Sequence, residues 1–282
     1  MRKIYRLLIL LVLCLTTYQG NAQSKDKAYY LEKSERQIRE GQNHKAIQTV
    51  SEGLKKYPES GKLYERRGLL YDSFGFHDEA IKDLYKAIEY TKNDSIKSFL
   101  YTNLGSYHFA IRQFKETYEL SQKALRLDST NIGALNNLAI SAMNLGKKQQ
   151  AVKSLKKILL LDTTFILAYT NIAYLYQAKG QHNKALSYLN KAATISPEEY
   201  LIYSNRSFSK LKLNDIEGAL KDVNHSLDLN PSNSYAYKIR ALIFLELNQT
   251  KNACKDLYTA QKNGYTRQYG QEVNELIEKH CR

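Results

Sequence analysis

Apolar residues between positions 166 and 197 follow the spacing of two consecutive helices. The first stripe recurs at the i, i+3, i+4 and i+7 positions that share one helix face, and comprises Tyr169, Ile172, Ala173 and Tyr176. The second stripe has the same period, and comprises Ala185, Leu186, Leu189 and Ala192. Gly180 separates the stripes, where a left-handed residue commonly ends a helix, and Pro197 follows the second stripe. The pattern predicts a helical hairpin.

This hairpin pattern recurs with a period of 34 residues. Its clearest marker is a small residue in the second stripe, found in four successive units at Ala151, Ala185, Ala219 and Ala253. Seven units, starting near residues 27, 61, 98, 132, 166, 200 and 234, tile residues 27–267 with a three-residue insertion at 95–97. Because one hairpin cannot bury its apolar face alone, the units must stack, and we expect an all-α solenoid.

The last segment, residues 268–282, breaks this period. Its apolar residues Val273, Leu276 and Ile277 share one helix face with charged residues between them. This pattern predicts a C-terminal capping helix, which a stack of repeats needs to cover its last apolar face.

The phased residues resemble the tetratricopeptide repeat. The second unit carries the signature at Tyr64, Gly68, Tyr71, Ala80, Leu84 and Ala87. The fifth unit carries it at Tyr169, Ala173, Tyr176, Ala185, Leu189, Ala192 and Pro197. The first and third units depart from it at Ser34, Gln37 and Thr117. The resemblance implies a right-handed superhelical solenoid of about seven units, whose concave face binds a protein or peptide without a cofactor.

The first 22 residues have the three parts of a secretory signal. Arg2, Lys3 and Arg6 precede the apolar run 7–15, and Ala22 offers a small-residue cleavage site before Gln23. The ending resembles signals of Bacteroidetes-type bacteria. Lipidation at Cys14 is an alternative, but Leu13 is larger than the residue that normally precedes a lipidated cysteine. We expect a protein of the periplasm or cell envelope, or a secreted one, without a transmembrane anchor after cleavage.

Composition and charge narrow the functional class. The chain of 282 residues contains only 3 Pro and 13 Gly, too few turn residues for a many-stranded β protein. Its formal net charge is +14, and removal of the signal's three cations leaves 14 − 3 = +11. The basic pairs are spread over different units, at Lys55–Lys56, Arg66–Arg67, Lys147–Lys148 and Lys156–Lys157. We therefore expect no nucleic-acid partner, while binding of a polyanion or an envelope surface remains the alternative function.

The sequence shows no motif of a catalytic, phosphate or metal site. GxGxxG, GxxxxGK[ST], HExxH, GxSxG and CxxC are all missing. His77 and His182 share one repeat position, which is normally an aromatic packing site rather than a ligand. We therefore predict no enzymatic activity, no cofactor and no bound metal.

Asparagines recur at one repeat position and mark a candidate binding face. They are Asn103, Asn137, Asn171 and Asn205, each 34 residues from the next. An amide side chain both donates and accepts hydrogen bonds, so such a row suits the backbone of an extended peptide, although the asparagines could instead bond helix to helix. Neighbouring positions predicted on the same face include Tyr174, Phe208, Tyr235 and Lys238.

The segment 203–207 resembles the repeat that holds chaperone C-terminal tails in some tetratricopeptide domains. Those domains need a basic pair on the next repeat and a Lys and an Asn on the preceding one. The matching positions here are Tyr235 and Ile239, then Thr170 and Tyr174. We therefore expect no carboxylate clamp.

Cys254 and Cys281 are the thiols that remain after signal removal. One lies in the last repeat and the other at the end of the cap, so they form either a disulfide or two free thiols. Resemblance to the ends of other exported bacterial tetratricopeptide proteins favours the disulfide. The oligomeric state is left open.

Overall fold

The computed structural model describes residues 26–281, so the predicted signal at residues 1–22 lies outside the described part. This part contains sixteen helices and no strand. In the first four units they are α2 (Lys27–Arg39), α3 (Asn43–Lys56), α4 (Gly61–Ser73), α5 (His77–Tyr90), α6 (Asp94–Ala110), α7 (Phe114–Leu127), α8 (Ile132–Asn144) and α9 (Lys148–Leu161). They continue as α10 (Ile166–Gln177), α11 (His182–Ile195), α12 (Tyr200–Lys212), α13 (Ile216–Leu229), α14 (Ser234–Glu246), α15 (Thr250–Lys262), α16 (Tyr265–Tyr269) and α17 (Glu272–His280).

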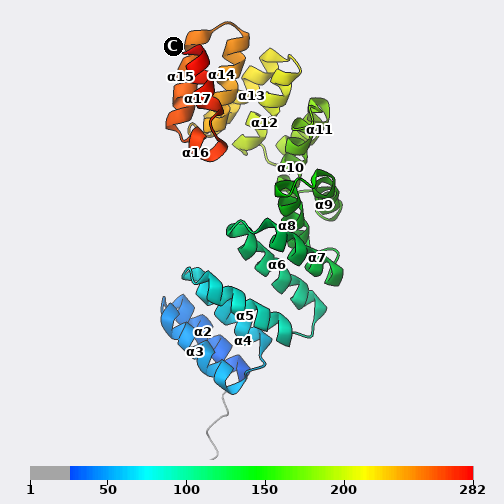
Figure 1. Ribbon diagram of the computed structural model, residues 1–282, viewed down its shortest axis with the longest axis vertical. Helices are drawn as coiled ribbons and strands as arrows, with labels where there is room; N and C mark the ends of the chain where they lie inside the picture. The colour runs from blue at the N-terminus through cyan, green and yellow to red at the C-terminus, as the bar shows by residue number, and fades with distance from the viewer. Residues whose placement is uncertain (1–25, 282) are drawn as a thin grey trace, which may run out of the picture. The chain divides into compact units, whose positions relative to one another are not determined.

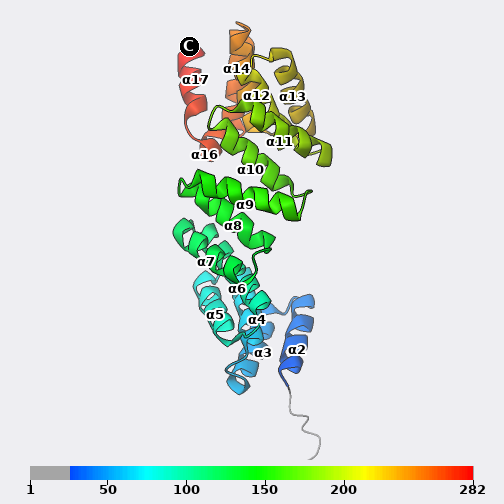
Figure 2. The same ribbon diagram turned by 90° about the vertical axis from the view of Figure 1, so that its right-hand side faces the viewer.

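From α2 to α7, and again from α9 to α15, each helix packs against the next one in the chain (Figures 1 and 2). The contacts divide the chain into two compact units, residues 1–134 and 135–282. The described apolar clusters include two in unit 1, centred on α2–α4 and α4–α7, and three in unit 2, the last of which joins α14 and α15 to the cap. Each unit therefore has several small cores in series rather than one central core.

The third hairpin differs from the predicted boundary. Its first helix, α6, begins at Asp94 instead of near residue 98, because the 95–97 insertion continues the helix by about one turn. The Asn93 side chain caps this longer helix by accepting a hydrogen bond from the backbone amide of Ile96 at 3.0 Å.

Small residues line the place where the two helices of each hairpin approach. Their side chains have no exposed surface, and they are Ala46, Ala80, Ala151, Ala185, Ala219 and Ala253. The third hairpin has Thr117 instead, which is equally buried and donates its hydroxyl to the carbonyl oxygen of Gly105 at 3.1 Å. This bond satisfies the extra polar group, which explains why the departure from the repeat signature is tolerated.

Each hairpin turn contains one residue of left-handed backbone conformation. Glycine or asparagine holds six of these positions, at Gly41, Gly75, Gly146, Gly180, Asn214 and Asn248. The third hairpin uses Arg112, with φ of 62°. In every turn the residue that follows the left-handed one donates its amide back to the last helical turn, for example from Gln181 to the Tyr176 carbonyl at 2.9 Å.

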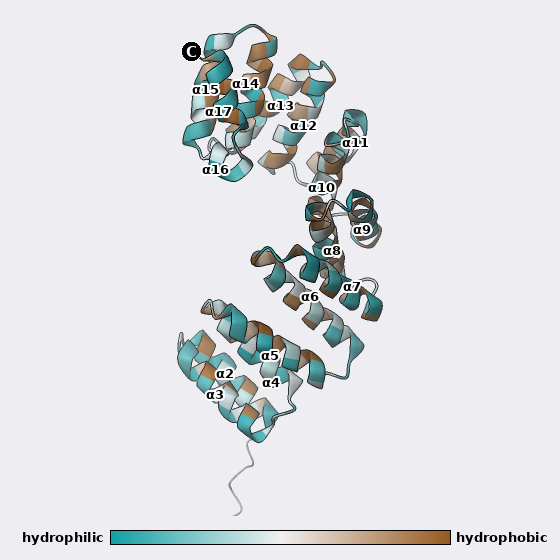
Figure 3. Ribbon diagram, in the orientation of Figure 1, coloured by the Kyte–Doolittle hydropathy of each residue, from teal (hydrophilic) through white to brown (hydrophobic). Residues whose placement is uncertain are grey.

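The C-terminal cap consists of two short helices rather than one. Gly270, with φ of 102°, joins α16 to α17, and Val273 of α17 is fully buried against the last hairpin. The helix α17 carries both polar and apolar residues (Figure 3). None of the described helices is both long and apolar enough to cross a membrane.

Candidate functional site

A groove of about 600 Å³ in unit 2 brings together several of the predicted binding residues. Its walls come from α10, α12, α14 and α16, with contributions from the chain just after α11 and before α12. The lining residues are Ile166, Leu167, Thr170, Asn171, Tyr174, Ser196, Glu199, Leu201, Asn205, Tyr235 and Tyr269.

Two of the four periodic asparagines line this groove. They are Asn171 and Asn205, which lie one repeat apart on α10 and α12. The side-chain amide nitrogen of Asn205 donates a hydrogen bond to the Leu201 carbonyl of its own helix at 2.8 Å. The group that Asn205 can offer to a ligand is therefore mainly its side-chain oxygen, which accepts hydrogen bonds. Asn103 belongs to unit 1, and Asn137 of α8 does not line the groove. The site therefore uses a shorter asparagine row than the sequence predicts.

Exposed apolar side chains form the groove's other recognition surface. Leu167 is 57% exposed and Tyr174 is 55% exposed, although both lie on helices whose other faces are buried. The side chains of Tyr235 and Tyr269 are in contact, with ring centroids 5.6 Å apart. Surfaces of this kind favour apolar ligands that a few polar groups orient.

Burial keeps the groove's packed tyrosines in the protonated form. It raises the pKa of Tyr235 far above the ordinary value, and Glu272, Tyr269 and Tyr174 add to the shift. Burial also raises the pKa of Tyr269, with a smaller contribution from Tyr200. Near neutral pH both phenols remain hydrogen-bond donors.

The structure places Phe208 and Lys238 beside the groove rather than in its lining. The Lys238 side chain is only 6% exposed and its ammonium lies 2.8 Å from a carboxylate oxygen of Glu272 in α17. The same ammonium lies 5.7 Å from the centre of the Phe208 ring and 5.8 Å from that of Tyr235. Lys238 thus links the last repeat to the cap, and its charge is already paired.

Sequence reasoning missed three lining residues, Leu167, Leu201 and Tyr269, which share a detectable pattern with the predicted Tyr235. Leu167, Leu201, Tyr235 and Tyr269 are each 34 residues apart, so three of them occupy the second residue of successive first helices. Tyr269 continues the spacing into the cap, although the cap has no hairpin. The 34-residue period, applied to exposed apolar positions as well as to asparagines, would have found this row.

The two histidines at the shared repeat position behave differently. His182 contacts the ring of Phe208 edge-on, with centroids 5.8 Å apart, and its buried Nδ1 has no hydrogen-bond partner. His77 is exposed and its Nδ1 lies 3.0 Å from an Asp72 carboxylate oxygen. Within residues 26–281 no group of three or more His, Cys, Asp or Glu side chains is arranged to hold a metal.

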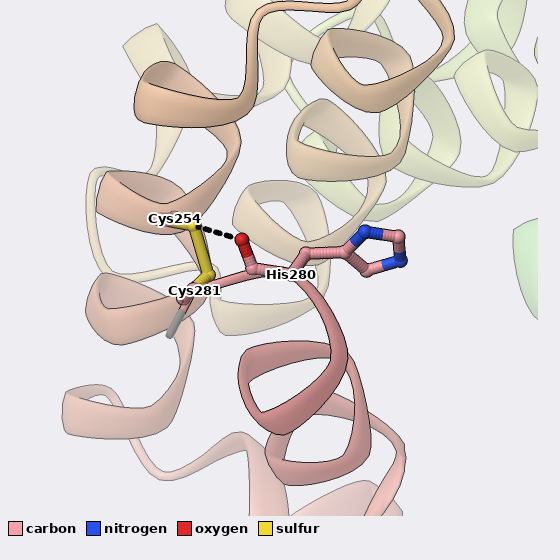
Figure 4. The surroundings of a disulfide bond; sticks show 3 residues. All are labelled: Cys254, His280 and Cys281. Atoms are coloured by element: carbon pink, nitrogen blue, oxygen red, sulfur yellow. Dashed lines mark hydrogen bonds between the residues drawn. A yellow bond between two sulfur atoms is a disulfide. The ribbon is translucent and has the colours of Figure 1, made fainter.

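Cys254 and Cys281 are joined in a disulfide that ties the end of the cap to α15, as Figure 4 shows. Their Cα atoms are 5.5 Å apart, within the usual range for a disulfide. The Sγ of Cys254 also lies 3.5 Å from the carbonyl oxygen of His280. Because α16 carries Tyr269, this bond helps to hold one wall of the groove.

Consecutive helical hairpins of one length, with small residues at the helix contact and a left-handed turn, define a helical-repeat protein. Three stretches, residues 61–94, 132–165 and 166–199, match the family model described as tetratricopeptide repeat. These stretches of the chain are therefore tetratricopeptide repeats. Proteins with such repeats generally mediate protein–protein interactions and are generally not enzymes.

Solved structures share this fold. A tetratricopeptide repeat protein from Parabacteroides merdae superposes with a TM-score of 0.68 at 17% identity, covering 91% of this chain and 99% of that one. MamA superposes with a TM-score of 0.56 at 23% identity, covering 63% and 95%. YrrB, described as a TPR protein with an unusual peptide-binding site, has a TM-score of 0.56 at 19% identity, covering 66% and 95%.

Relatives in sequence match only part of the chain. Tetratricopeptide repeat protein 6 of Homo sapiens is 32% identical over 107 residues, which are 38% of this chain and 20% of that protein. The Hsp70-Hsp90 organizing protein of Triticum aestivum is 25% identical over 111 residues, 38% of this chain and 18% of that protein. The chain thus matches about a fifth of the length of either relative.

Proposed function

We propose that this protein is a non-enzymatic adaptor that binds an extended segment of a partner protein in the groove of unit 2. The observation that carries the proposal is the groove's lining, in which a row of exposed apolar side chains runs beside two periodic asparagines. Apolar side chains of a bound segment can pack on Leu167 and Leu201, while Asn171 and Asn205 hydrogen-bond its backbone amides. The description of YrrB as a peptide-binding protein of the same fold supports this interpretation.

Neutral polar and aromatic residues suit a polypeptide better than a polyanion. The groove lining contains no lysine or arginine, although the chain has 42 of them. A partner held there is therefore recognised largely by shape, apolar contact and amide hydrogen bonds, and its binding should depend on salt much less steeply than the binding of a polyanion does.

The test compares groove and non-groove asparagines. Residues 23–282, carrying either Asn171→Ala with Asn205→Ala or the matched pair Asn103→Ala with Asn137→Ala, are used to capture partners by cross-linking from the envelope fraction. We expect the groove pair to weaken capture about five- to tenfold, from the loss of two hydrogen bonds, and the matched pair to leave it unchanged. Equal loss in both pairs, or loss that follows a lowered melting temperature, would show that the asparagines are structural.

We also propose that the protein works in the bacterial cell envelope or periplasm, or is secreted, because residues 1–22 have the composition of an export signal. Cell fractionation with mass spectrometry of the processed chain tests this. The expected result is an extracytoplasmic protein beginning at Gln23. An unprocessed chain in the cytoplasm would contradict it.

A second candidate function is binding of a polyanion, and one observation favours it. A shallow surface pocket at the start of α9 is lined by Lys147, Lys148, Lys153 and Lys179. If this pocket carries the function, affinity for polyphosphate falls steeply between about 50 and 200 mM salt, and Lys148→Gln with Lys179→Gln, which removes two of the four lysines, lowers that salt dependence by about half. Capture that depends only shallowly on salt and that the groove variants weaken favours the adaptor function.

A further inference from the structure

The groove carries the opposite charge balance to the rest of the chain. Its one ionisable carboxylate belongs to Glu199, just before α12, and no cation lines it, in a protein with a formal charge of +14. The ammonium of Lys238 lies 5.8 Å from the centre of the Tyr235 ring and is paired with Glu272 at 2.8 Å. Counting this pair together with Glu199, the local charge is 1 − 2 = −1.

Tyrosine rings from three different helices converge on the same groove. Tyr235 of α14 and Tyr269 of α16 have ring centroids 5.6 Å apart, and Tyr265 packs behind Tyr269 at 5.0 Å. Tyr174 of α10 lines the groove with its side chain half exposed and is close enough to Tyr235 to affect its pKa. The faces of such rings attract cations electrostatically.

The apolar part of the groove suits the stem of a long cationic side chain. Leu167 and Leu201 lie exposed in the same lining as the rings and Glu199. A lysine places four methylenes on apolar surface while its ammonium reaches a polar or aromatic site. One carboxylate oxygen of Glu199 accepts a hydrogen bond from the backbone amide of Leu201 at 3.2 Å. This bond holds the carboxylate in place and leaves its negative charge available to a ligand.

We propose that the groove is selective for a lysine side chain of the bound partner segment, whose ammonium lies against the rings of Tyr174, Tyr235 and Tyr269 with Glu199 as its counter-ion. This inference rests on the proposed adaptor function and adds the chemistry of one residue of the partner. The occupant is a positively charged polypeptide segment, and an uncharged segment of the same shape binds more weakly.

The test uses two small probes that differ in the ammonium group. N-acetyl-lysine methylamide and N-acetyl-norleucine methylamide are titrated into residues 23–282, while the tyrosine ring signals are followed by NMR. We expect the lysine probe to bind at least about threefold more tightly and to shift the signals of Tyr174, Tyr235 and Tyr269. Equal binding of the two probes, or no shift of these signals with the lysine probe, overturns the proposal.

Two variants with matched controls locate the effect. Glu199→Gln retains an oxygen for the Leu201 amide, and its control is Glu198→Gln, an exposed residue outside the lining. Tyr269→Leu removes a groove ring, and its control is Tyr258→Leu on the exposed face of α15. Each groove variant should reduce the preference for lysine over norleucine by at least about twofold, bringing it toward equal binding, while the controls leave it unchanged. A control variant with the same effect contradicts the assignment.

The two proposals fail in distinguishable ways. If the lysine probe binds but the asparagine variants capture envelope partners normally, the cation site stands and the adaptor function of this groove is wrong. If capture depends on the groove while lysine and norleucine probes bind equally, the adaptor function stands and the lysine selectivity is wrong.

Discussion

Single residues in the hairpin turns show how strongly backbone conformation constrains this sequence. A left-handed residue costs little when it is glycine and somewhat more when it is asparagine, and six of the seven turns use one of these two. Arg112 is the exception, and its Cβ lies close to the following carbonyl at this φ of 62°. The third hairpin therefore contains local strain.

Replacement of this residue should stabilise the protein. We expect Arg112→Gly to raise the free energy of unfolding by about 0.5–1 kcal/mol, because relief of the strain exceeds the entropy that glycine adds to the unfolded chain. Urea unfolding followed by circular dichroism measures the change. Arg112→Ala is the control, since it removes the charge and keeps the Cβ. A gain of equal size from alanine would assign the effect to the charge.

A second residue-scale prediction concerns the pH dependence of stability. Burial lowers the pKa of His182 below its ordinary value, and the positive charge of Lys212 lowers it further. The imidazole is therefore neutral in the folded protein at pH values where the unfolded chain already binds a proton. Because the unfolded state then binds more protons, the free energy of unfolding falls as the pH drops below about 6.5.

NMR titration of the His182 ring checks this directly. Its midpoint should lie below that of the denatured protein, and Lys212→Met should raise it part of the way. Lys221→Met, at an exposed position on α13, is the control and should leave it unchanged. A midpoint at or above the denatured value contradicts the cause assigned here.

In three hairpins, an Arg–Asp ion pair joins the two helices at a position where another hairpin has an apolar contact. In the last hairpin Arg240 of α14 holds both carboxylate oxygens of Asp256 of α15, at 2.7 and 3.0 Å, and donates to Asn224 of α13 at 2.9 Å. Arg67 and Arg206 repeat this geometry with Asp83 and Asp222. One guanidinium thus joins three helices.

The third hairpin has leucines in the same two positions. Leu104 and Leu120 stand where the other hairpins have Arg and Asp, and both are buried. We therefore expect that the arginine and the aspartate can be replaced together by two leucines, but that neither of them can be replaced alone. Removing the arginine alone leaves the Asp256 carboxylate, only 5% exposed, without its partner.

We predict that Arg240→Leu lowers the free energy of unfolding by about 3 kcal/mol, and that adding Asp256→Leu restores most of the loss. Chemical denaturation of both variants provides the measurement. Lys86→Ala, which removes an exposed ion pair with Glu89, serves as a control and should change stability little. A double variant as unstable as the single one would mean that two leucines, as in the third hairpin, cannot replace the ion pair in the last hairpin.

The cap is the second element that depends on a specific link. Its disulfide to α15 closes a loop with a sequence separation of 27 and holds α16, which contributes Tyr269 to the groove. We expect Cys281→Ser to lower the free energy of unfolding by about 2–4 kcal/mol. The same variant should increase hydrogen exchange in residues 265–280 and weaken the binding of the lysine probe to the groove. Thiol titration of the denatured, unreduced residues 23–282 should find no free thiol. Two reactive thiols would contradict the disulfide.

Over the whole molecule, stability should be local because most contacts join helices that are neighbours in the chain. A repeat array of this kind unfolds in parts, unlike a protein with one core. The effect of a substitution in one hairpin should therefore fade along the array.

Hydrogen exchange of the Arg240→Leu variant tests this locality. We expect faster exchange in α14, α15 and the cap, a smaller increase in α12 and α13, and no change in α4 and α5. The Arg112→Gly variant is the matched comparison and should instead protect α6 and α7. A uniform increase along the chain after Arg240→Leu would indicate global, cooperative unfolding.

The hairpins were predictable from sequence because their signals are local. Spacing of apolar residues, small residues such as Ala185 and turn residues such as Gly180 each act within one unit, and the period repeats them often enough to be recognised. The early start of α6 was missed because an insertion at 95–97 can extend a helix or a loop equally well.

The sequence by itself determined the repeat architecture and proposed an asparagine row, but only the tertiary structure decided which members meet. Asn171 and Asn205 share a groove with Tyr235 and Tyr269 because the cap folds back beside α14, and Lys238 is withdrawn from it by Glu272 of that same cap. Although Tyr269 follows Tyr235 by one repeat length, the cap forms no hairpin, so its contacts are set by how it packs on α14 and α15. Periodicity specifies how each unit folds, whereas the end of the array is specified by packing, which a one-dimensional pattern does not contain.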